Sequence, residues 1–378
     1  MILLINASTL SGTGVSQVAI SFIYECRNFP ENEYHVFLSK TIEAQINAED
    51  FKENFKFYVI KNHPIYGFKG FRSRCEMINL VKRIKPNCVF SVFGPSWWTP
   101  QVPHLMGYAY PHYVYPESPI FRIMPIKELL YRYLQRSIHK YYLRKNGQYY
   151  VCETEDVSKR LSHYLHVNPN RIFTVSNSYN HFFSTFKPGN NLLPLKEAKE
   201  FRFVSLCSPY LHKNLTILNE VIPLLKRNVE FEIIKFVVTI DKDVYDTIFS
   251  DEVKGSILNI GVLPPNLCPQ LYFECDALFL PTLLECFSAN YPEAMFMKKP
   301  ILTSNLSFAT SVCGDAALYF DPLDAHDIVE QIKKVVTDPF CYKNLINKGV
   351  ERLRHFLTSS ERAKQYLSIC ASILRDEN

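Results

Sequence analysis

Glycine and tryptophan are scarce in this chain of 378 residues, which contains 12 glycines and 2 tryptophans. The 11 cysteines are scattered and odd in number, and no two of them have Cys-x-x-Cys spacing. This argues against a disulfide framework or a zinc ribbon and favours a reducing, cytoplasmic setting. No apolar run approaches the roughly 18 residues that a membrane-spanning helix needs. The N-terminus also lacks the basic and apolar regions of a signal peptide.

The composition is that of a globular protein with sizeable cores. Hydrophobic residues make up 47% of the chain, and a length of 378 residues corresponds to about two domains. The first 190 residues hold 22 Lys and Arg against 13 Asp and Glu, a net charge of +9, whereas the remainder holds 20 against 24, a net charge of −4. The basic residues are interspersed and no base-stacking module is recognisable, so we expect no nucleic-acid partner.

The chain contains two successive α/β patterns. An apolar run at Ile2–Ile5, a loop with two glycines and an amphipathic stretch at Val15–Tyr24 predict a strand, a loop and a helix. Similar short strands follow up to residue 175, and a polar linker at 187–194 precedes a second series that begins with a strand at Phe201–Leu206. We therefore expect a first domain at 1–186, a second at 187–358 and a final helix at about 359–378.

The segment Pro281–Ala294 carries the strongest functional signal. It follows a buried-type strand at Ala277–Leu280, leads into a helix, and contains two carboxylates, Glu285 and Glu293, separated by seven residues. A helix start presents unpaired N–H groups suited to phosphate, and carboxylates around it can accept hydrogen bonds from sugar hydroxyls. The spacing alone is equally compatible with two solvated acids around a helix start.

The same segment resembles the Glu-x(7)-Glu signature of glycosyltransferase family 4, a large group of retaining enzymes. Four neighbouring stretches also fit that family in order: 260–263, 271–282, 299–305 and 313–322. The resemblance implies an α/β fold of the GT-B type, with two Rossmann-like domains facing across a cleft and a C-terminal helix that crosses back to the first domain. It also implies a nucleoside diphosphate sugar as donor, held by the second domain without a metal ion or other cofactor.

A lysine at the start of the second domain is the candidate cation for the diphosphate. Lys213 follows the strand at Phe201–Leu206 and precedes a helix, where a lysine can act as a point charge for phosphate. The family usually has a Gly-Arg pair five positions ahead of this lysine, and here those positions are Cys207 and Ser208. One phosphate-binding cation is therefore missing or supplied elsewhere.

The resemblance also assigns roles around the two glutamates. Glu285 would bind the hydroxyls of the transferred sugar, and Glu293 the hydroxyls of the ribose. Ser208 is a further expected donor contact. The residues at the helix start are expected to bind the donor through their N–H groups: Phe287, Ser288, Ala289 and Asn290. A DxD motif at 241–243 matches the metal site of the other main glycosyltransferase fold, but it lies among surface charges, so we expect no metal there.

Three residues of the first domain are further candidates. Gly12 and Gly14 lie in the first strand–helix loop, which is not a dinucleotide fingerprint because Gln17 occupies its last glycine position. By resemblance, this loop contacts the donor phosphate and the acceptor. His112 is the nearest match to a family histidine close to the reacting sugar, although a surface-loop histidine is an equal alternative, and His104 is a weaker choice.

The stretch 120–145 combines seven basic residues and one acid with apolar residues at near-helical spacing. Such a helix can lie on an anionic membrane surface. The alternative is an ordinary domain helix with a solvated basic face, which the lack of a tryptophan on its apolar side favours.

The resemblance implies a metal-independent, retaining hexosyltransferase. By the same resemblance, the expected acceptor is a saccharide, in the first place a lipid-linked one as in the assembly of bacterial O-antigen or capsule. The expected location is the cytoplasm or the inner face of its membrane. Two alternatives remain open: a non-catalytic GT-B subunit that binds nucleotide or glycan, and a nucleotide-sugar epimerase. The missing arginine at position 208 is the reason for keeping the first of them.

Overall fold

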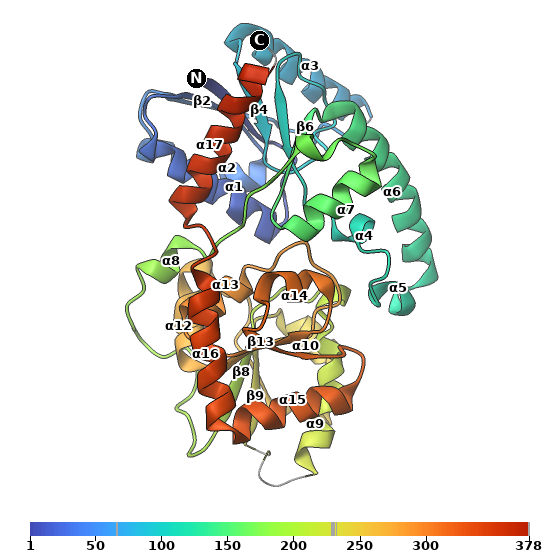
Figure 1. Cartoon of the computed structure of the whole chain (residues 1–378), viewed down its shortest axis with the longest axis vertical. Coiled ribbons are helices and arrows are strands. Elements are labelled where there is room, and N and C mark those ends of the chain that lie inside the picture. The colour runs from blue at the N-terminus through green and yellow to red at the C-terminus, as the bar shows by residue number, and fades with distance from the viewer. Residues whose placement is uncertain (66, 228–230, 232, 377–378) are drawn as a thin grey trace. The chain divides into compact units, whose positions relative to one another are not determined.

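The computed structural model describes residues 1–65, 67–227, 231 and 233–376. The chain forms two compact units (Figure 1). Unit 1 contains Met1–Tyr115, Pro125–Asn177 and Leu357–Asn378, and unit 2 contains Pro116–Met124 and Ser178–Phe356. The main crossing between the units thus lies after Asn177, upstream of the linker expected at 187–194. In addition, a short segment from the first half of the chain belongs to unit 2.

Unit 1 is built on a seven-stranded parallel sheet in the order β3-β2-β1-β4-β5-β6-β7. The strands are β1 (Ile2–Ala7), β2 (Glu33–Leu38), β3 (Phe55–Val59), β4 (Cys88–Ser91), β5 (His104–Gly107), β6 (Tyr149–Cys152) and β7 (Ile172–Thr174). The order reverses at β1, which has β2 on one side and β4 on the other. Ligands of open α/β sheets bind at such a switch point, outside the carboxyl ends of the strands.

Successive side chains of the central strand β1 pack into two separate cores, one on each face of the sheet. Leu3 and Ile5 pack into one cluster with α1 (Thr13–Glu25) and α17 (Ser359–Asp376), whereas Leu4 packs into another with α3 (Phe68–Ile84). This follows from the period of two along a strand, which sends successive side chains to opposite faces of the sheet. A continuous apolar run is therefore what a strand buried on both faces requires.

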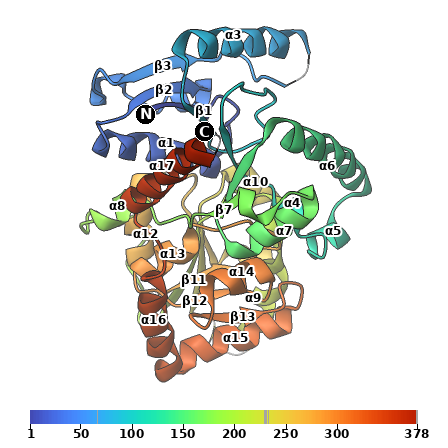
Figure 2. The same ribbon diagram turned by 45° about the horizontal axis from the view of Figure 1, so that its top comes forward.

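The C-terminal helix α17 packs against the first unit, as expected from the sequence. Tyr366 stacks edge-on against Phe22 of α1 with ring centroids 5.4 Å apart, and Arg362 donates a 2.9 Å hydrogen bond to the Ser21 hydroxyl. Figure 2 shows α17 running beside α1. The remaining helices of unit 1 are α2 (Lys40–Glu43), α4 (Pro111–Val114), α6 (Ile126–Asn146) and α7 (Glu155–Leu165).

Unit 2 repeats the design with a six-stranded parallel sheet in the order β10-β9-β8-β11-β12-β13. The strands are β8 (Phe201–Ser205), β9 (Ile234–Val238), β10 (Ile257–Asn259), β11 (Ala277–Leu280), β12 (Ile301–Ser304) and β13 (Ala317–Phe320). Here the order reverses between β8 and β11. The carboxyl ends of these two strands therefore mark the expected ligand site of unit 2.

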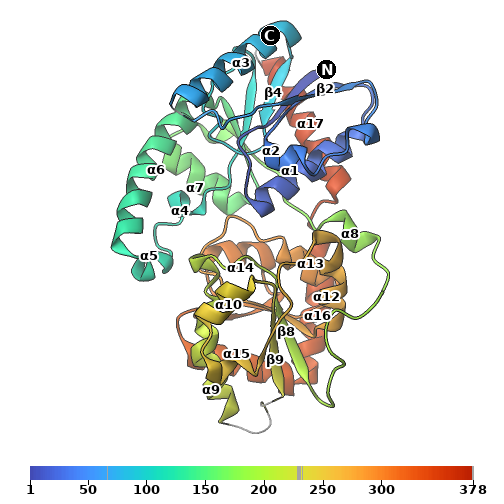
Figure 3. The same ribbon diagram turned by 180° about the vertical axis from the view of Figure 1, so that it is seen from behind.

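Two aspartates fix the starts of the long helices that follow β13. Asp324 accepts hydrogen bonds from backbone N–H groups at the start of α15 (Ala325–Thr337), and Asp338 does the same for α16 (Pro339–Leu353). Viewed from behind, α15 lies beside α9 (Leu218–Lys226) (Figure 3). The other helices of unit 2 are α5 (Ile120–Ile123), α8 (His181–Ser184), α10 (Lys242–Ile248), α11 (Asp251–Lys254), α12 (Cys268–Glu274), α13 (Asn290–Phe296) and α14 (Ser307–Cys313).

The fold class expected from the sequence is confirmed: two parallel sheets, each with interleaved helices, and a C-terminal helix that returns to the first unit. Within the described residues, no helix has both the length and the apolar character needed to cross a bilayer.

Candidate active site

Two loops of unit 2 meet where its strand order reverses. One runs from Leu206 to Asn214 after β8, and the other from Pro281 to Ala289 after β11. Because β8 and β11 are parallel neighbours, both loops leave the same edge of the sheet. This edge brings together the candidate residues that the sequence separates by some 70 positions.

Direct hydrogen bonds connect the two loops. The Leu283 N–H donates to the His212 carbonyl over 2.7 Å, and the Thr282 hydroxyl donates to the same carbonyl over 3.0 Å. The Asn290 side-chain amide donates to the Leu206 carbonyl over 2.7 Å. Side chains on both loops are therefore positioned by backbone contacts that do not involve a ligand.

Lys213 and Glu285 form an ion pair across these loops. The Lys213 ammonium donates to Glu285 Oε1, which also accepts a 3.2 Å hydrogen bond from the Thr282 hydroxyl. The two side chains are only 15% and 13% exposed. Burial would lower the pKa of Lys213, but the carboxylate of Glu285 outweighs it and raises the pKa above its usual value. The lysine thus carries its charge in a largely desolvated position.

Glu293 lies in the first turn of α13 and is buried, with 8% of its surface exposed. Its Oε2 atom has no hydrogen-bond partner among the residues that the structure describes. Burial raises the pKa of the Glu293 carboxyl to about 8, and a hydrogen bond with the Tyr272 hydroxyl opposes this rise only in part. A buried oxygen without a partner costs free energy, so the site is better satisfied with a hydroxyl donor bound.

The chain between the two glutamates offers backbone donors. The N–H groups of residues 287–290 donate no hydrogen bond to any other described group, and no side chain caps α13. Ser288 is buried, while Phe287 and Ala289 are partly exposed. The Asn290 side chain is already engaged by Leu206, so only its backbone N–H is available to a ligand.

The loop after β8 contains no second cation close to Lys213. Ser208 is partly exposed, and its carbonyl accepts a 2.9 Å hydrogen bond from Tyr210 N–H. Next to it, burial raises the pKa of the Cys207 thiol to about 11, so this side chain stays neutral. Lys213 is consequently the cationic side chain that this loop brings to the edge of the sheet.

The three first-domain candidates lie in unit 1. Gly12 is the extended residue before α1, and Gly14 belongs to the first turn of that helix. A Cβ atom added at Gly14 would meet no atom within 4 Å, and one at Gly12 only Val15 Cγ2 at 3.4 Å. The fold itself therefore does not require glycine at either position, and close approach of a ligand remains a reason for it. His112 lies in α4 and is partly exposed.

His104, the weaker histidine candidate, is part of the core of unit 1. It is 1% exposed, and its Nδ1 lies 2.7 Å from the Asn146 carbonyl, so Nδ1 carries the proton and Nε2 accepts from the Ser91 hydroxyl at 2.8 Å. Burial lowers the pKa of His104 to about 4. This histidine is neutral, fully hydrogen-bonded and structural.

The DxD motif also has a structural explanation. Asp241 precedes α10, and its carboxylate accepts a 2.9 Å hydrogen bond from the Asp243 N–H, which caps the helix. Within the described ranges, no three side chains of His, Cys, Asp or Glu gather as metal ligands usually do.

Three residues that support the site have no strong sequence signal. Thr282 could have been noticed as a polar residue directly after a buried strand, but Tyr272 on α12 is indistinguishable from core aromatics. Ser118, in the segment Pro116–Met124, donates a 2.7 Å hydrogen bond to the Leu283 carbonyl, two residues before Glu285. Only the fold brings a residue 165 positions away to this loop.

Comparisons with known proteins agree with this description. Residues 194–352 match the family model of glycosyl transferases group 1. Over 103 residues the chain is 28% identical to O-antigen chain mannosyltransferase B of Escherichia coli, a match that spans 27% of each protein. HepE of Anabaena, solved with UDP and glucose, superposes with a TM-score of 0.73 at 11% identity, over 98% of this chain and 100% of HepE. WaaG, a glycosyltransferase involved in lipopolysaccharide biosynthesis, gives 0.72 at 12% identity, over 98% and 99%.

At these identities the solved structures show the fold alone, whereas the family match covers the loops that carry Lys213, Glu285 and Glu293. Residues 194–352 thus form a glycosyl transferases group 1 domain, and together with the GT-B fold of the chain they support a glycosyltransferase.

Proposed function

We propose that the protein is a retaining glycosyltransferase of family 4 that transfers a sugar from a nucleoside diphosphate sugar to a hydroxyl of a saccharide. The observation that carries the proposal is the largely shielded Lys213–Glu285 ion pair at the switch point of unit 2, close in sequence to Glu293 with its unsatisfied oxygen. A cation, an acceptor of sugar hydroxyls and an acceptor of ribose hydroxyls are the three polar functions that such a donor needs.

Each donor group has a proposed partner in unit 2. Lys213 neutralises the diphosphate, whose charge grows as the bond to the sugar breaks, and the N–H groups of residues 287–290 bind its oxygens. A preorganised cation with low exposure stabilises a leaving group far better than one in water. Glu285 binds hydroxyls of the sugar and Glu293 hydroxyls of the ribose. In this scheme no metal ion is needed, because protein donors carry the charge.

The Lys213–Glu285 pair has a consequence for donor binding. In the absence of ligand, Glu285 supplies the counter-charge of Lys213, so a diphosphate must compete with a carboxylate for the same ammonium. When the sugar hydroxyls engage Glu285 and the phosphates engage Lys213, both partners of the pair acquire new hydrogen bonds. The pair therefore favours a complete donor over a bare phosphate.

The acceptor is assigned to unit 1, with Gly12, Gly14 and His112 as substrate contacts. The loops after β1 and β4, at residues 8–12 and 92–103, contain no Asp, Glu, Lys or Arg. An uncharged edge suits the hydroxyls of a neutral saccharide. The names of two similar proteins, an O-antigen chain mannosyltransferase and a lipopolysaccharide glycosyltransferase, support a lipid-linked acceptor in surface-polysaccharide assembly.

A binding module without catalysis is the second candidate, and Ser208 in place of an arginine is the observation that favours it. This candidate predicts binding of donor without release of diphosphate on addition of acceptor. An epimerase predicts isomerisation of the donor sugar without an acceptor.

A thermal-shift screen without metal tests the proposal, with UDP, GDP, ADP, CMP, dTDP and NAD as ligands. Ligand at about 100 times its dissociation constant stabilises a protein by about 2.7 kcal/mol, which is a readable shift. We expect one nucleoside diphosphate to raise the melting temperature and the others to have little effect. A shift with none of them, or with NAD alone, contradicts the proposed donor site.

A further inference from the structure

Helix α6 turns an apolar face to solvent. Ile126, Leu130 and Leu134 follow one another at intervals of four residues and are 72%, 67% and 63% exposed. We call the exposed apolar surface of this helix the α6 face: Ile126, Leu130, Tyr131, Tyr133, Leu134, Ile138 and Tyr141. A helix that only covers the core of a domain shows the opposite arrangement, with its apolar stripe buried.

The inward side of α6 is largely polar, with His139 and Asn146 buried beside one leucine, Leu143. Arg132 donates hydrogen bonds to Glu128 over 3.2 Å and to Gln135 over 3.1 Å. The charged ends of Arg136 and Lys140 lie over the Tyr164 ring of α7, 5.1 and 5.0 Å from its centre. Arg136 and Lys140 thus attach the helix to α7, whereas the hydrogen bonds of Arg132 stay within α6. The α6 face remains exposed to solvent. This finding favours an interaction surface over an ordinary domain helix.

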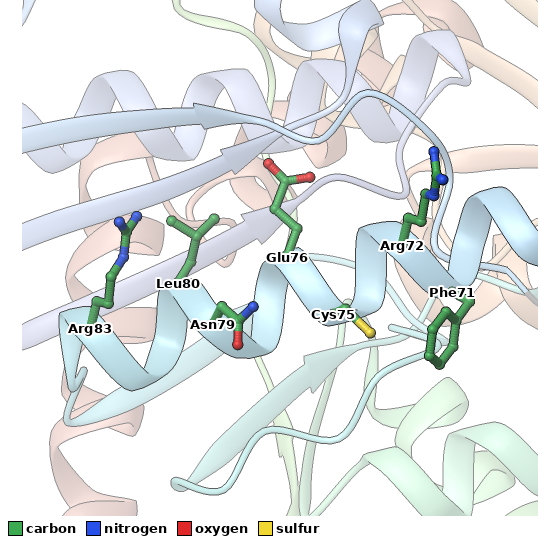
Figure 4. A pocket seen from close by; sticks show the side chains of 7 residues that line it. All are labelled: Phe71, Arg72, Cys75, Glu76, Asn79, Leu80 and Arg83. Atoms are coloured by element: carbon green, nitrogen blue, oxygen red, sulfur yellow. The ribbon is translucent and has the colours of Figure 1, made fainter.

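A second exposed apolar group lies at the start of α3. Phe68 and Phe71 are 71% and 56% exposed, and Arg72 lies 4.6 Å over the Phe68 ring. Figure 4 shows Phe71 and Arg72 at one end of a shallow groove along this helix, with Arg83 at the other end. Both α3 and α6 lie on the outside of unit 1 (Figure 2). Contiguous exposed apolar patches on soluble proteins often mark binding sites.

The charges around the α6 face are of one sign. Lys127, Arg144 and Lys145 are exposed on the same helix. The only acid in the sequence of the helix is Glu128, which is bound to Arg132. The natural partner is therefore both apolar and anionic.

We propose that the α6 face docks on the surface of an anionic phospholipid bilayer. The helix lies in the plane of the interface, with its leucines and isoleucines among the acyl chains and its lysines and arginines at the phosphates. Tyr131, Tyr133 and Tyr141 fit the boundary between the two layers, because a tyrosine has an apolar ring and a polar hydroxyl. At 1.5 Å per residue, the 21 residues of α6 extend over about 31 Å, a length typical of interfacial helices.

Charge complementarity favours lipid over a second copy of the chain. A symmetric dimer through this face would bring the lysines and arginines of one copy against those of the other. Anionic headgroups instead attract each of these residues by about 1 kcal/mol, or roughly fivefold in affinity. The proposal goes beyond sugar transfer and does not depend on the donor site.

Sedimentation with phospholipid vesicles at low salt tests the proposal with the full chain. The vesicles consist of phosphatidylcholine alone or of phosphatidylcholine with phosphatidylglycerol. We expect the wild-type protein to sediment with the anionic vesicles, to remain in solution with the neutral ones, and to be released by salt.

Two pairs of variants with matched controls separate the apolar and the charge contributions. Leu130→Ser/Leu134→Ser should weaken vesicle binding at least about tenfold, whereas Leu195→Ser/Phe340→Ser, which alters two exposed apolar side chains of unit 2, should not weaken it. Arg144→Gln/Lys145→Gln should weaken binding roughly 30-fold. Its control, Lys242→Gln/Lys343→Gln, removes the same charge from exposed positions of unit 2 and should have little effect.

Several outcomes would overturn the proposal. The first is the absence of binding to anionic vesicles, and the second is an equal loss of vesicle binding in the control variants. The third is a wild-type dimer that the Leu130→Ser/Leu134→Ser substitutions dissociate, which would identify the α6 face as a protein interface. A thermal shift by the same diphosphate in every variant shows that folding and the donor site are intact. If the wild-type protein binds no nucleotide donor, only the proposed function is contradicted. The vesicle result still decides whether the α6 face binds membranes.

Discussion

The two units share a sheet design but differ in what lies at the point where the strand order reverses. In unit 2 the loops after β8 and β11 carry Lys213 and Glu285, which are paired and largely shielded from solvent. In unit 1 the loops after β1 and β4 carry no charged residue and contain both tryptophans of the chain, Trp97 and Trp98. Both tryptophans are buried, at 6% and 3% exposure. The same topology thus provides an electrostatic site in one unit and an uncharged edge in the other.

This difference suggests a division of labour that follows from chemistry rather than from fold. A diphosphate leaving group requires a fixed cation and backbone donors, which unit 2 supplies. A neutral saccharide needs no counter-charge, which suits the uncharged loops of unit 1. The exposed apolar helix α6 also belongs to unit 1, the unit to which we propose that the acceptor binds.

The largest effect is expected from removing the cation of unit 2. Lys213→Ala should lower the rate of sugar transfer by about 10³-fold, because a preorganised charge at a leaving group is lost. Measurement of diphosphate release with donor and acceptor tests this. The control is Lys343→Ala, which removes an exposed lysine of the same unit. Normal turnover in Lys213→Ala with an intact fold would remove Lys213 from the mechanism.

The second-largest effect is expected from Glu285, the acidic partner of the ion pair. Glu285→Gln should abolish most transfer, by about 10²-fold, while the affinity for the bare nucleoside diphosphate stays equal or rises, because the carboxylate no longer competes for Lys213. Calorimetric titration and a transfer assay on the same preparation check both halves. Weaker diphosphate binding in Glu285→Gln would show that the pair acts only by holding Lys213 in place.

A third prediction uses pH to examine Glu293. Its pKa is raised to about 8 by burial, so in the free protein near neutral pH the carboxyl is mostly protonated. Ribose hydroxyls favour the carboxylate, so nucleotide binding should release a proton and strengthen as the pH rises from about 6 to about 8. Titration in buffers of different ionisation enthalpy measures the released proton.

The Glu293→Gln variant is the control for this pH effect. It should bind nucleotide more weakly than the wild type at about pH 8 and without proton release. Wild-type binding that does not change over the same pH range would argue against a contact between Glu293 and the nucleotide.

The smallest effect concerns the glycines of unit 1. Gly14→Ala should leave stability unchanged or raise it by up to about 1 kcal/mol, since the added methyl group meets no atom and alanine is the better helix former. Transfer should nevertheless fall if a substrate approaches this loop closely. Gly255→Ala, whose added Cβ also meets nothing within 4 Å, should leave transfer unaffected. Equal rates of sugar transfer in Gly14→Ala and Gly255→Ala would contradict the assignment of Gly14 to a substrate site.

Much of unit 2 could be predicted because its signals are local. The strand at Ala277–Leu280 has the expected bounds, and the carboxylates that follow it have a recognisable spacing. The approach of Lys213 to Glu285 depends instead on the strand order, because the two strands that precede their loops, β8 and β11, become neighbours only in the folded sheet. Ser118 was not predictable, because only the complete fold shows that its segment belongs to unit 2.

Unit 1 shows what periodicity leaves undecided. The sequence of α6 predicts an amphipathic helix, but the pattern does not say which side faces the domain. The structure answers this through Arg136 and Lys140, which pack against Tyr164. The helix α3 (Phe68–Ile84) is hard to recognise from sequence because it contains Gly70 near its start, and the close approach of this residue to the Ile65 carbonyl explains the glycine.

The most direct test of the central claim compares a nucleoside diphosphate with its monophosphate by calorimetric titration, using the base identified in the thermal-shift screen. If Lys213 binds the diphosphate, the wild-type protein should prefer the diphosphate by about tenfold or more, and Lys213→Ala should lose most of this preference. An undiminished preference in Lys213→Ala would contradict the account, because the second phosphate would then be bound by other groups.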